Sequence, residues 1–160
     1  MPDDLALMIR TAAQAAEIAN RYWRTAQKIV EKPDGDLAVD AHLRETLMAA
    51  RPGYGWLSEE TPDDDTRLSR ARTFIVDPID GTRNYIAGEK TWAHSLALAE
   101  QGRVIAAVVL LPQRDKIYTA TLGGGAWLND RPIAASDRTA PDGATILANR
   151  ATMQAENWPR

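Results

Sequence analysis

The feature that most constrains the fold of this 160-residue chain is a series of strand-like segments separated by very short turns. The four segments cover residues 91–99, 104–111, 116–121 and 126–128. Each turn between them contains glycine, proline or aspartate. Strands joined by such short turns pair antiparallel, because parallel neighbours need a crossover of a dozen or more residues. The second half of the chain therefore predicts an antiparallel sheet of consecutive strands.

The first of these segments indicates which face of the sheet is buried. Its large side chains stand at every second position, at Trp92, His94, Leu96 and Leu98. Alternate positions of a strand point to the same face, so we expect this face against the core, with His94 half-buried. Two shorter strands are expected earlier, at residues 55–57 and 73–76.

Two helices are expected before these strands. The first begins at Pro2 and keeps helical apolar spacing to about Val30, and residues 32–35 then provide turn chemistry. The second is expected over residues 36–50. Its expected inward-facing residues are Leu37, Leu43, Leu47 and Met48. A helix pair followed by consecutive strands predicts an α+β domain in which two helices are layered on an antiparallel sheet.

The composition argues against several classes of protein. The net charge is −3 and there is no basic stripe, so we expect no nucleic-acid partner. Cysteine is absent, which excludes disulfides and thiolate metal sites, and the only histidines are His42 and His94. No segment has the length of a membrane span, and the acidic N-terminus has no apolar signal core. We therefore expect no membrane association and a cytoplasmic location.

The segment F-I-V-D-P-I-D-G-T-R-N, residues 74–84, carries the chemistry of the chain. An apolar strand ends here in two carboxylates, Asp77 and Asp80, whose oxygens suit magnesium better than zinc. Gly81 allows a ligand to approach the main chain closely. The amides of Gly81 and Thr82 are expected to open a helix, and a helix N-terminus attracts phosphate.

A second acidic pair, Glu59-Glu60, follows the apolar Trp56-Leu57. Each cluster has a plainer interpretation, because D-P-x-D-G is an ordinary turn and adjacent acids are commonly a solvated surface. Two acidic clusters that each follow an apolar segment favour converging metal ligands instead. The polar residues 61–70, with three consecutive aspartates, are expected to form an exposed loop.

Together, S-E-E at residues 58–60 and D-P-I-D-G-T at 77–82 closely resemble the inositol monophosphatase family, magnesium-dependent and lithium-sensitive phosphomonoesterases. The resemblance extends from about Lys32 to Pro132. It implies the N-terminal domain of an αβαβα sandwich phosphatase.

The resemblance also implies a set of metal ligands. Glu59 and Asp77 would bind one ion together with the Ile79 carbonyl, and Asp77 and Asp80 would share a second. The cofactor implied is Mg²⁺, with two or three ions per site, and Mn²⁺ is a possible substitute.

The catalytic roles implied by the resemblance fall on the neighbouring residues. Thr82 would help to activate the attacking water, the amides of Gly81 and Thr82 would hold the phosphate, and Glu60 would stand beside the metals. The family also has an acidic residue on the preceding helix. A gapless alignment from Lys32 places His42 there, whereas counting back 23 residues from Glu59 reaches Asp36. Asp36 is preferred because a carboxylate can orient Thr82, and the family's V-T-x-A segment would then be missing before it.

Members of the family continue into a second α/β domain with a W-D-x-A-x-G motif, which this sequence lacks. We therefore expect a metal-binding domain over residues 1–143. Residues 144–160, with a strand-like stretch at 144–148, would begin a second domain that is missing or truncated. The family also implies a homodimer.

The expected activity is hydrolysis of a small phosphate monoester, with inositol monophosphate as the first candidate. The alternatives are a 3'(2'),5'-bisphosphate nucleotide or histidinol phosphate. A hypothesis of another class is a non-catalytic fragment that binds metal or a protein partner.

Overall fold

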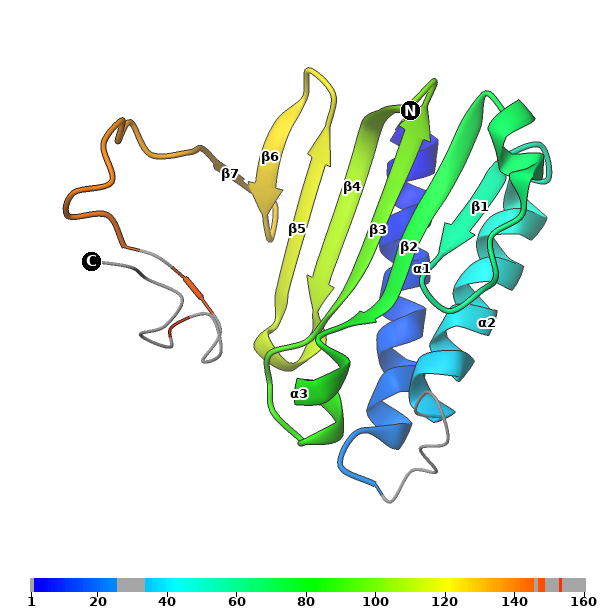
Figure 1. Ribbon diagram of the computed structural model, residues 1–160, viewed down its shortest axis with the longest axis horizontal. Coiled ribbons are helices and arrows are strands. Elements are labelled where there is room, and N and C mark those ends of the chain that lie inside the picture. Colours follow the sequence, from blue (N-terminus) through cyan, green and yellow to red (C-terminus); the bar gives the residue numbers. More distant parts are fainter. Residues whose placement is uncertain (1, 26–33, 146, 149–152, 154–160) are drawn as a thin grey trace.

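A computed structural model describes residues 2–25, 34–145, 147–148 and 153, and within them a helix pair covers one face of a seven-stranded sheet (Figure 1). The strands lie in the sheet in the order of the sequence. They are β1 (Gly55–Ser58), β2 (Arg72–Asp80), β3 (Ala93–Glu100), β4 (Arg103–Leu111), β5 (Lys116–Thr121), β6 (Gly125–Leu128) and β7 (Arg131–Ile133).

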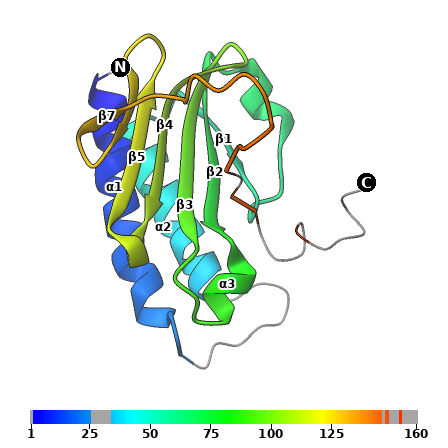
Figure 2. The same cartoon turned by 90° about the vertical axis from the view of Figure 1, so that its left-hand side faces the viewer.

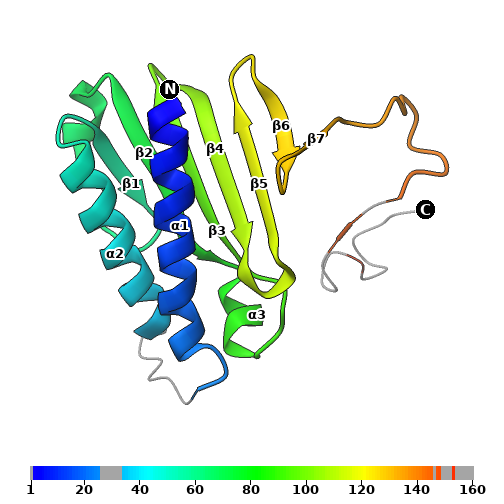
Figure 3. The same cartoon turned by 180° about the vertical axis from the view of Figure 1, so that it is seen from behind.

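Two long helices form the second layer. α1 (Pro2–Tyr22) and α2 (Asp34–Ala50) lie side by side on the sheet, as Figure 3 shows from behind. A short helix, α3 (Thr82–Ile86), follows β2, and two 3₁₀ turns, η1 (Asp65–Ser69) and η2 (Pro112–Arg114), lie in connections. This arrangement confirms the predicted α+β class, a helix pair layered on a sheet.

The pairing departs from the prediction at one edge of the sheet. All neighbours from β2 to β7 are antiparallel, as expected, but β1 is parallel to β2, with Gly55 opposite Thr73. The sheet is therefore mixed. The thirteen residues between β1 and β2 explain the difference, because a connection of that length allows the crossover that parallel strands need. This connection is largely exposed, as predicted, although η1 gives part of it a regular structure.

The predicted helix boundaries were partly wrong. α1 ends at Tyr22 rather than near Val30, because Arg24 has a φ of 60°, which a right-handed helix cannot continue; residues 26–33 lie outside the described part. α2 begins at Asp34, so Asp34 and Gly35 of the expected turn are helical, whereas residues 32 and 33 lie outside the described part. Leu37 was predicted to point inward but is 49% exposed.

The core lies between the helix pair and the sheet. Leu43 and Leu47 of α2 are fully buried, Met48 packs at its margin, and Phe74 and Leu98 face them from the sheet. Each fully buried leucine or phenylalanine contributes about 1.5–3 kcal/mol relative to exposure. The predicted inward face of β3 is confirmed, because Trp92, His94, Leu96 and Leu98 are all at most 2% exposed. His94 is fully buried rather than half-buried.

The end of the described chain differs most from the sequence-based expectation. β7 was not predicted, and its Pro132 is tolerated because the strand is at the edge of the sheet. Of the predicted strand at 144–148, the described residues 144, 145, 147 and 148 form no strand, and Ile146 lies outside the described part. Across the described residues, no helix is both long and apolar enough to cross a membrane.

Candidate metal and phosphate site

The two acidic segments meet at one end of the sheet. β1 and β2 are parallel, so Glu59, which follows β1, and Asp77 to Asp80, which end β2, lie at the same end. The main chain continues this pairing, because the Glu59 N–H donates to the Val76 carbonyl at 3.3 Å. α3 and the N-terminal end of α2 lie at this end of the molecule as well (Figures 1 and 2).

A bulge in β2 brings Asp77 and Asp80 to one face of the sheet. Residues three apart in a strand ordinarily point to opposite faces. Here Asp77 pairs with Ser95 and Asp80 pairs with Ala93, so three steps along β2 match two along β3. The extra residue restores both aspartates to the face away from the helices. The strand was expected to end at Val76, whereas it continues to Asp80.

Gly81 connects this strand to α3. Its φ of 88° places it in the left-handed region, and its carbonyl accepts hydrogen bonds from the Asn84 and Tyr85 amides. A Cβ at this position would approach the Thr91 carbonyl to 3.1 Å, so any other residue would be strained here. The Tyr85 hydroxyl donates to the Ala19 carbonyl at 2.7 Å in the core, which ties α3 to α1.

Thr82 lies against the first turn of α2. Its Oγ1 is 3.0 Å from the Ile79 carbonyl and 3.4 Å from Oδ2 of Asp36, and the hydroxyl donates to these acceptors. Asp36 is 1% exposed. His42, the alternative at this position of the family pattern, is further along the helix, and among the described residues it has no hydrogen bond to Thr82. The contact therefore favours Asp36 as the acid beside Thr82.

Neighbouring carboxylates place negative charge beside Asp77. The pKa of Asp77 is raised to about 7, first because the group is desolvated by burial, and next because Glu59 and Asp80 place negative charge beside it. A side-chain hydrogen bond with Glu59 and the charge of Glu60 raise it further. The negative charge around Asp77 thus disfavours its ionised form, and a cation would be favourable in this place.

The donors at this site fit magnesium in kind. They are carboxylate oxygens and a main-chain carbonyl, the ligands of a hard cation. No three acidic or histidine side chains in the described ranges are already arranged around a single point. Mg²⁺ does not need such an arrangement, since it commonly binds one or two carboxylates and completes its shell with water and phosphate oxygens.

A buried histidine contacts the bulged segment from the helix-covered face of the sheet. Nδ1 of His94 forms a hydrogen bond with the Pro78 carbonyl, and the ring packs edge-on against Trp92 at 5.5 Å. Burial lowers the pKa of His94 to about 4, so the ring is neutral and donates from Nδ1. The sequence indicated a buried face here but not this contact.

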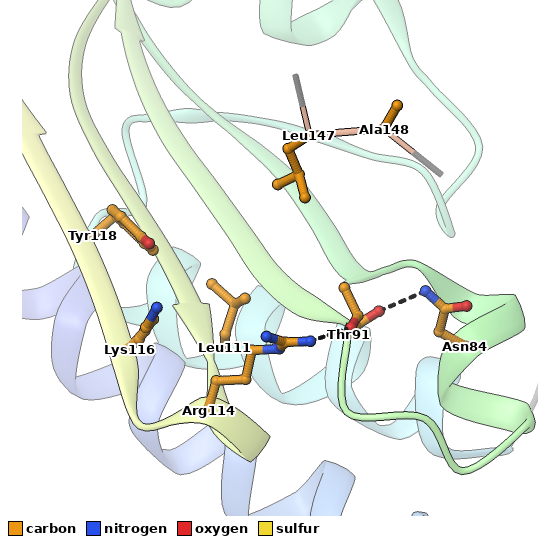
Figure 4. A pocket seen from close by; sticks show the side chains of 8 residues that line it. All are labelled: Asn84, Thr91, Leu111, Arg114, Lys116, Tyr118, Leu147 and Ala148. Carbon is orange, nitrogen blue, oxygen red and sulfur yellow. Dashed lines mark hydrogen bonds between the residues drawn. The ribbon is translucent and has the colours of Figure 1, made fainter. Parts of the chain in front are cut away.

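A groove adjoins the acidic cluster on the side of β4 and β5. It has a volume of about 520 Å³ and includes Arg114, Lys116 and Tyr118 in its lining (Figure 4). Arg114 donates to the Thr91 hydroxyl at 2.7 Å. A smaller hollow of about 290 Å³ shares Thr91 with this groove and reaches Asp80. We call the two together the Arg114–Lys116 groove.

Comparison with known proteins identifies the family. The model of the inositol monophosphatase family matches residues 3–160, and the chain belongs to this family. An inositol-1-monophosphatase of Rhizobium meliloti is 44% identical over 111 residues, 69% of this chain and 41% of that protein. A histidinol-phosphatase of Mycobacterium tuberculosis is 38% identical over 132 residues, 78% and 50% of the two chains.

The solved structures agree with this assignment. The crystal structure of the extragenic suppressor protein SuhB from Bartonella henselae superposes with a TM-score of 0.76 at 30% identity, over 85% of this chain and 55% of that one. The chain thus spans about half the length of the relatives it matches. The predicted resemblance is confirmed as a family relationship.

Proposed function

We propose that this chain supplies the metal- and phosphate-binding part of a Mg²⁺-dependent phosphomonoesterase, with inositol monophosphate as the leading substrate. The observation that carries the proposal is the negative charge of Glu59 and Asp80 beside Asp77, together with the contact between Thr82 and Asp36. The relative from Rhizobium meliloti, named an inositol-1-monophosphatase, supports the choice of substrate.

The metal ligands in this proposal are Glu59, Asp77, Asp80 and the Ile79 carbonyl. Mg²⁺, when bound, would neutralise phosphate oxygens and lower the pKa of a water molecule. Two or three Mg²⁺ ions would be held, and Mn²⁺ could substitute for them. The Ile79 carbonyl has two lone pairs, so it can accept from the Thr82 hydroxyl at 3.0 Å and still face a cation.

The proton-handling group in this proposal is the Thr82 hydroxyl. Its hydrogen points to Ile79 or Asp36, which leaves its lone pairs free to accept a hydrogen bond from the attacking water. Asp36 thereby orients the hydroxyl. The amides of Gly81 and Thr82 would donate to the phosphate, and Glu60 would add negative charge beside the cations.

A second candidate substrate is a 3'(2'),5'-bisphosphate nucleotide, because of the Arg114–Lys116 groove. Among the described residues, neither Arg114 nor Lys116 takes part in an ion pair. Two cations in a groove that reaches Asp80 suit a second phosphate on the substrate. Histidinol phosphate ranks third, because its ammonium group would be repelled there. A non-catalytic role in binding metal or a partner is the hypothesis of another class.

The wider setting of the proposal follows the family. We propose a cytoplasmic homodimer that acts on small phosphorylated molecules and not on nucleic acid or membranes. The chain has a net charge of −3, which does not by itself attract phosphates, so the substrate would bind through the metal ions.

The test is Mg²⁺-dependent release of phosphate from inositol 1-phosphate, 3'-phosphoadenosine 5'-phosphate and histidinol phosphate. Asp80→Asn should abolish release, and Asp115→Asn, an exposed aspartate in a turn, should leave it unchanged. Release that survives in Asp80→Asn would refute the ligand assignment. No release from any substrate, with Mg²⁺ still raising the melting temperature, would favour the non-catalytic role.

A further inference from the structure

Asp40 of α2 is a buried carboxylate, and among the described residues it has no hydrogen bond to Thr82 or to the bulged strand. Its Oδ1 accepts from the Ser58 hydroxyl at 2.5 Å, and its Oδ2 accepts from the Thr61 hydroxyl at 2.8 Å. These two residues stand immediately before and after the acidic pair Glu59-Glu60. Asp40 therefore holds both ends of the segment that brings Glu59 to the metal site.

The Ser58 hydroxyl extends the same network into the acidic pair. It donates to Asp40 and accepts from the Glu60 N–H at 3.3 Å. A serine hydroxyl has one hydrogen and two lone pairs, so it can do both at once. The main chain of the segment is thus attached to Asp40 through Ser58 as well as through Thr61.

α2 connects this network to the phosphate segment. Asp36 and Asp40 are four residues apart and lie on one face of the helix, about 6 Å apart along its axis. Asp36 contacts Thr82, whereas Asp40 contacts Ser58 and Thr61. Because a single rigid helix holds both segments, their separation is set by the helix and not by the loops.

A carboxylate can accept from both hydroxyls at once. Two hydroxyl donors approach from different residues, and each needs its own acceptor oxygen. Asparagine has one acceptor oxygen and would face one hydroxyl with an amide. No ion pair among the described residues involves Asp40, so its contacts are directed at the acidic segment and not at a basic partner.

We propose that Asp40 is a positioning residue that sets the Mg²⁺ affinity of the site by holding Glu59 against Asp77. This inference rests on the proposed function, because it assumes that Glu59 and Asp77 are metal ligands. Partners that orient metal ligands from outside typically change metal affinity by about 10–100-fold when they are removed.

The test is isothermal titration of Mg²⁺ into the full chain and its variants, without substrate. Asp40→Ala should weaken Mg²⁺ binding by about 10–100-fold. Thr61→Val keeps the shape of the side chain and removes one donor, so it should produce a smaller loss in the same direction. Asp40→Asn keeps one acceptor and should fall between Asp40→Ala and the unmodified chain. Glu45→Ala removes an exposed acid from the same helix and should leave the affinity unchanged.

The outcomes separate this inference from the proposed function. If the unmodified chain binds Mg²⁺ and both Asp40→Ala and Thr61→Val bind it with the same affinity, the positioning role is wrong. Asp40 is then only a structural residue, whatever the melting temperatures of the two metal-free variants. If Asp40→Ala does not fold, the folded Thr61→Val decides in the same way. If the unmodified chain itself binds no Mg²⁺, the proposed function fails, and the positioning role fails with it.

Discussion

The raised pKa of Asp77 makes Mg²⁺ affinity depend on pH in a specific way. A metal that binds the carboxylate must displace the proton, so the apparent dissociation constant is multiplied by one plus the ratio of protonated to ionised Asp77. With a pKa of about 7, the ratio is one near neutral pH. The multiplier is then ~11 at pH 6, ~2 at pH 7 and ~1.1 at pH 8. We therefore expect Mg²⁺ to bind about tenfold more weakly at pH 6 than at pH 8.

Titration calorimetry in two buffers with different ionisation enthalpies measures both the affinity and the protons released. Release should be ~0.9 proton per site at pH 6 and ~0.1 at pH 8. Glu60→Gln removes one of the charges that raise the pKa of Asp77, so its affinity profile should shift to lower pH. An affinity that is constant from pH 6 to pH 8, with no proton release, would refute the reasoning.

Three further predictions follow from the same structure. Without metal, Asp77 binds its proton more tightly in the folded than in the unfolded chain, so its contribution to stability should be full below pH 4 and lost as pH rises through about 7. The melting temperature of the apo chain should therefore fall over this range more than that of Asp77→Asn, and an equal change in the two would contradict this. Tyr85→Phe removes the buried bond to Ala19 and should cost about 1–1.5 kcal/mol in urea unfolding, and an unchanged midpoint would show that the bond adds nothing. Gly81→Ala should cost about 1–2 kcal/mol or more, because of the positive φ and the nearby Thr91 carbonyl; equal stability would mean that the backbone relaxes there.

Much of the fold was predictable because its signals are local. The short turns of the meander predicted the antiparallel order from β3 to β6, and the alternation around Leu96 predicted the buried face. The parallel pairing of β1 was not predictable in this way, because it depends on a longer connection whose path is decided by tertiary packing. The end of α1 was missed because the apolar pattern continues past Tyr22, and only the left-handed Arg24 shows that the helix has ended.

The candidate site was predictable in its residue types and less so in its geometry. Two acidic clusters after apolar segments indicated a cation, and the resemblance to the family, through its usual interval before Glu59, indicated Asp36. The bulge that turns Asp77 and Asp80 to one face was invisible, since it is defined only by the pairing with β3. The contacts of Asp40 and His94 were missed for a similar reason. Their partners are far away in the sequence, and no local pattern distinguishes a supporting buried residue from an ordinary one.

The most direct test of the central claim is anomalous X-ray scattering from a crystal of this chain grown with Mn²⁺ in place of Mg²⁺. The account predicts a metal peak within bonding distance of the carboxylates of Asp77 and of Glu59 or Asp80. A well-ordered site without such a peak, or a peak only at the exposed aspartates 63–65, would contradict it.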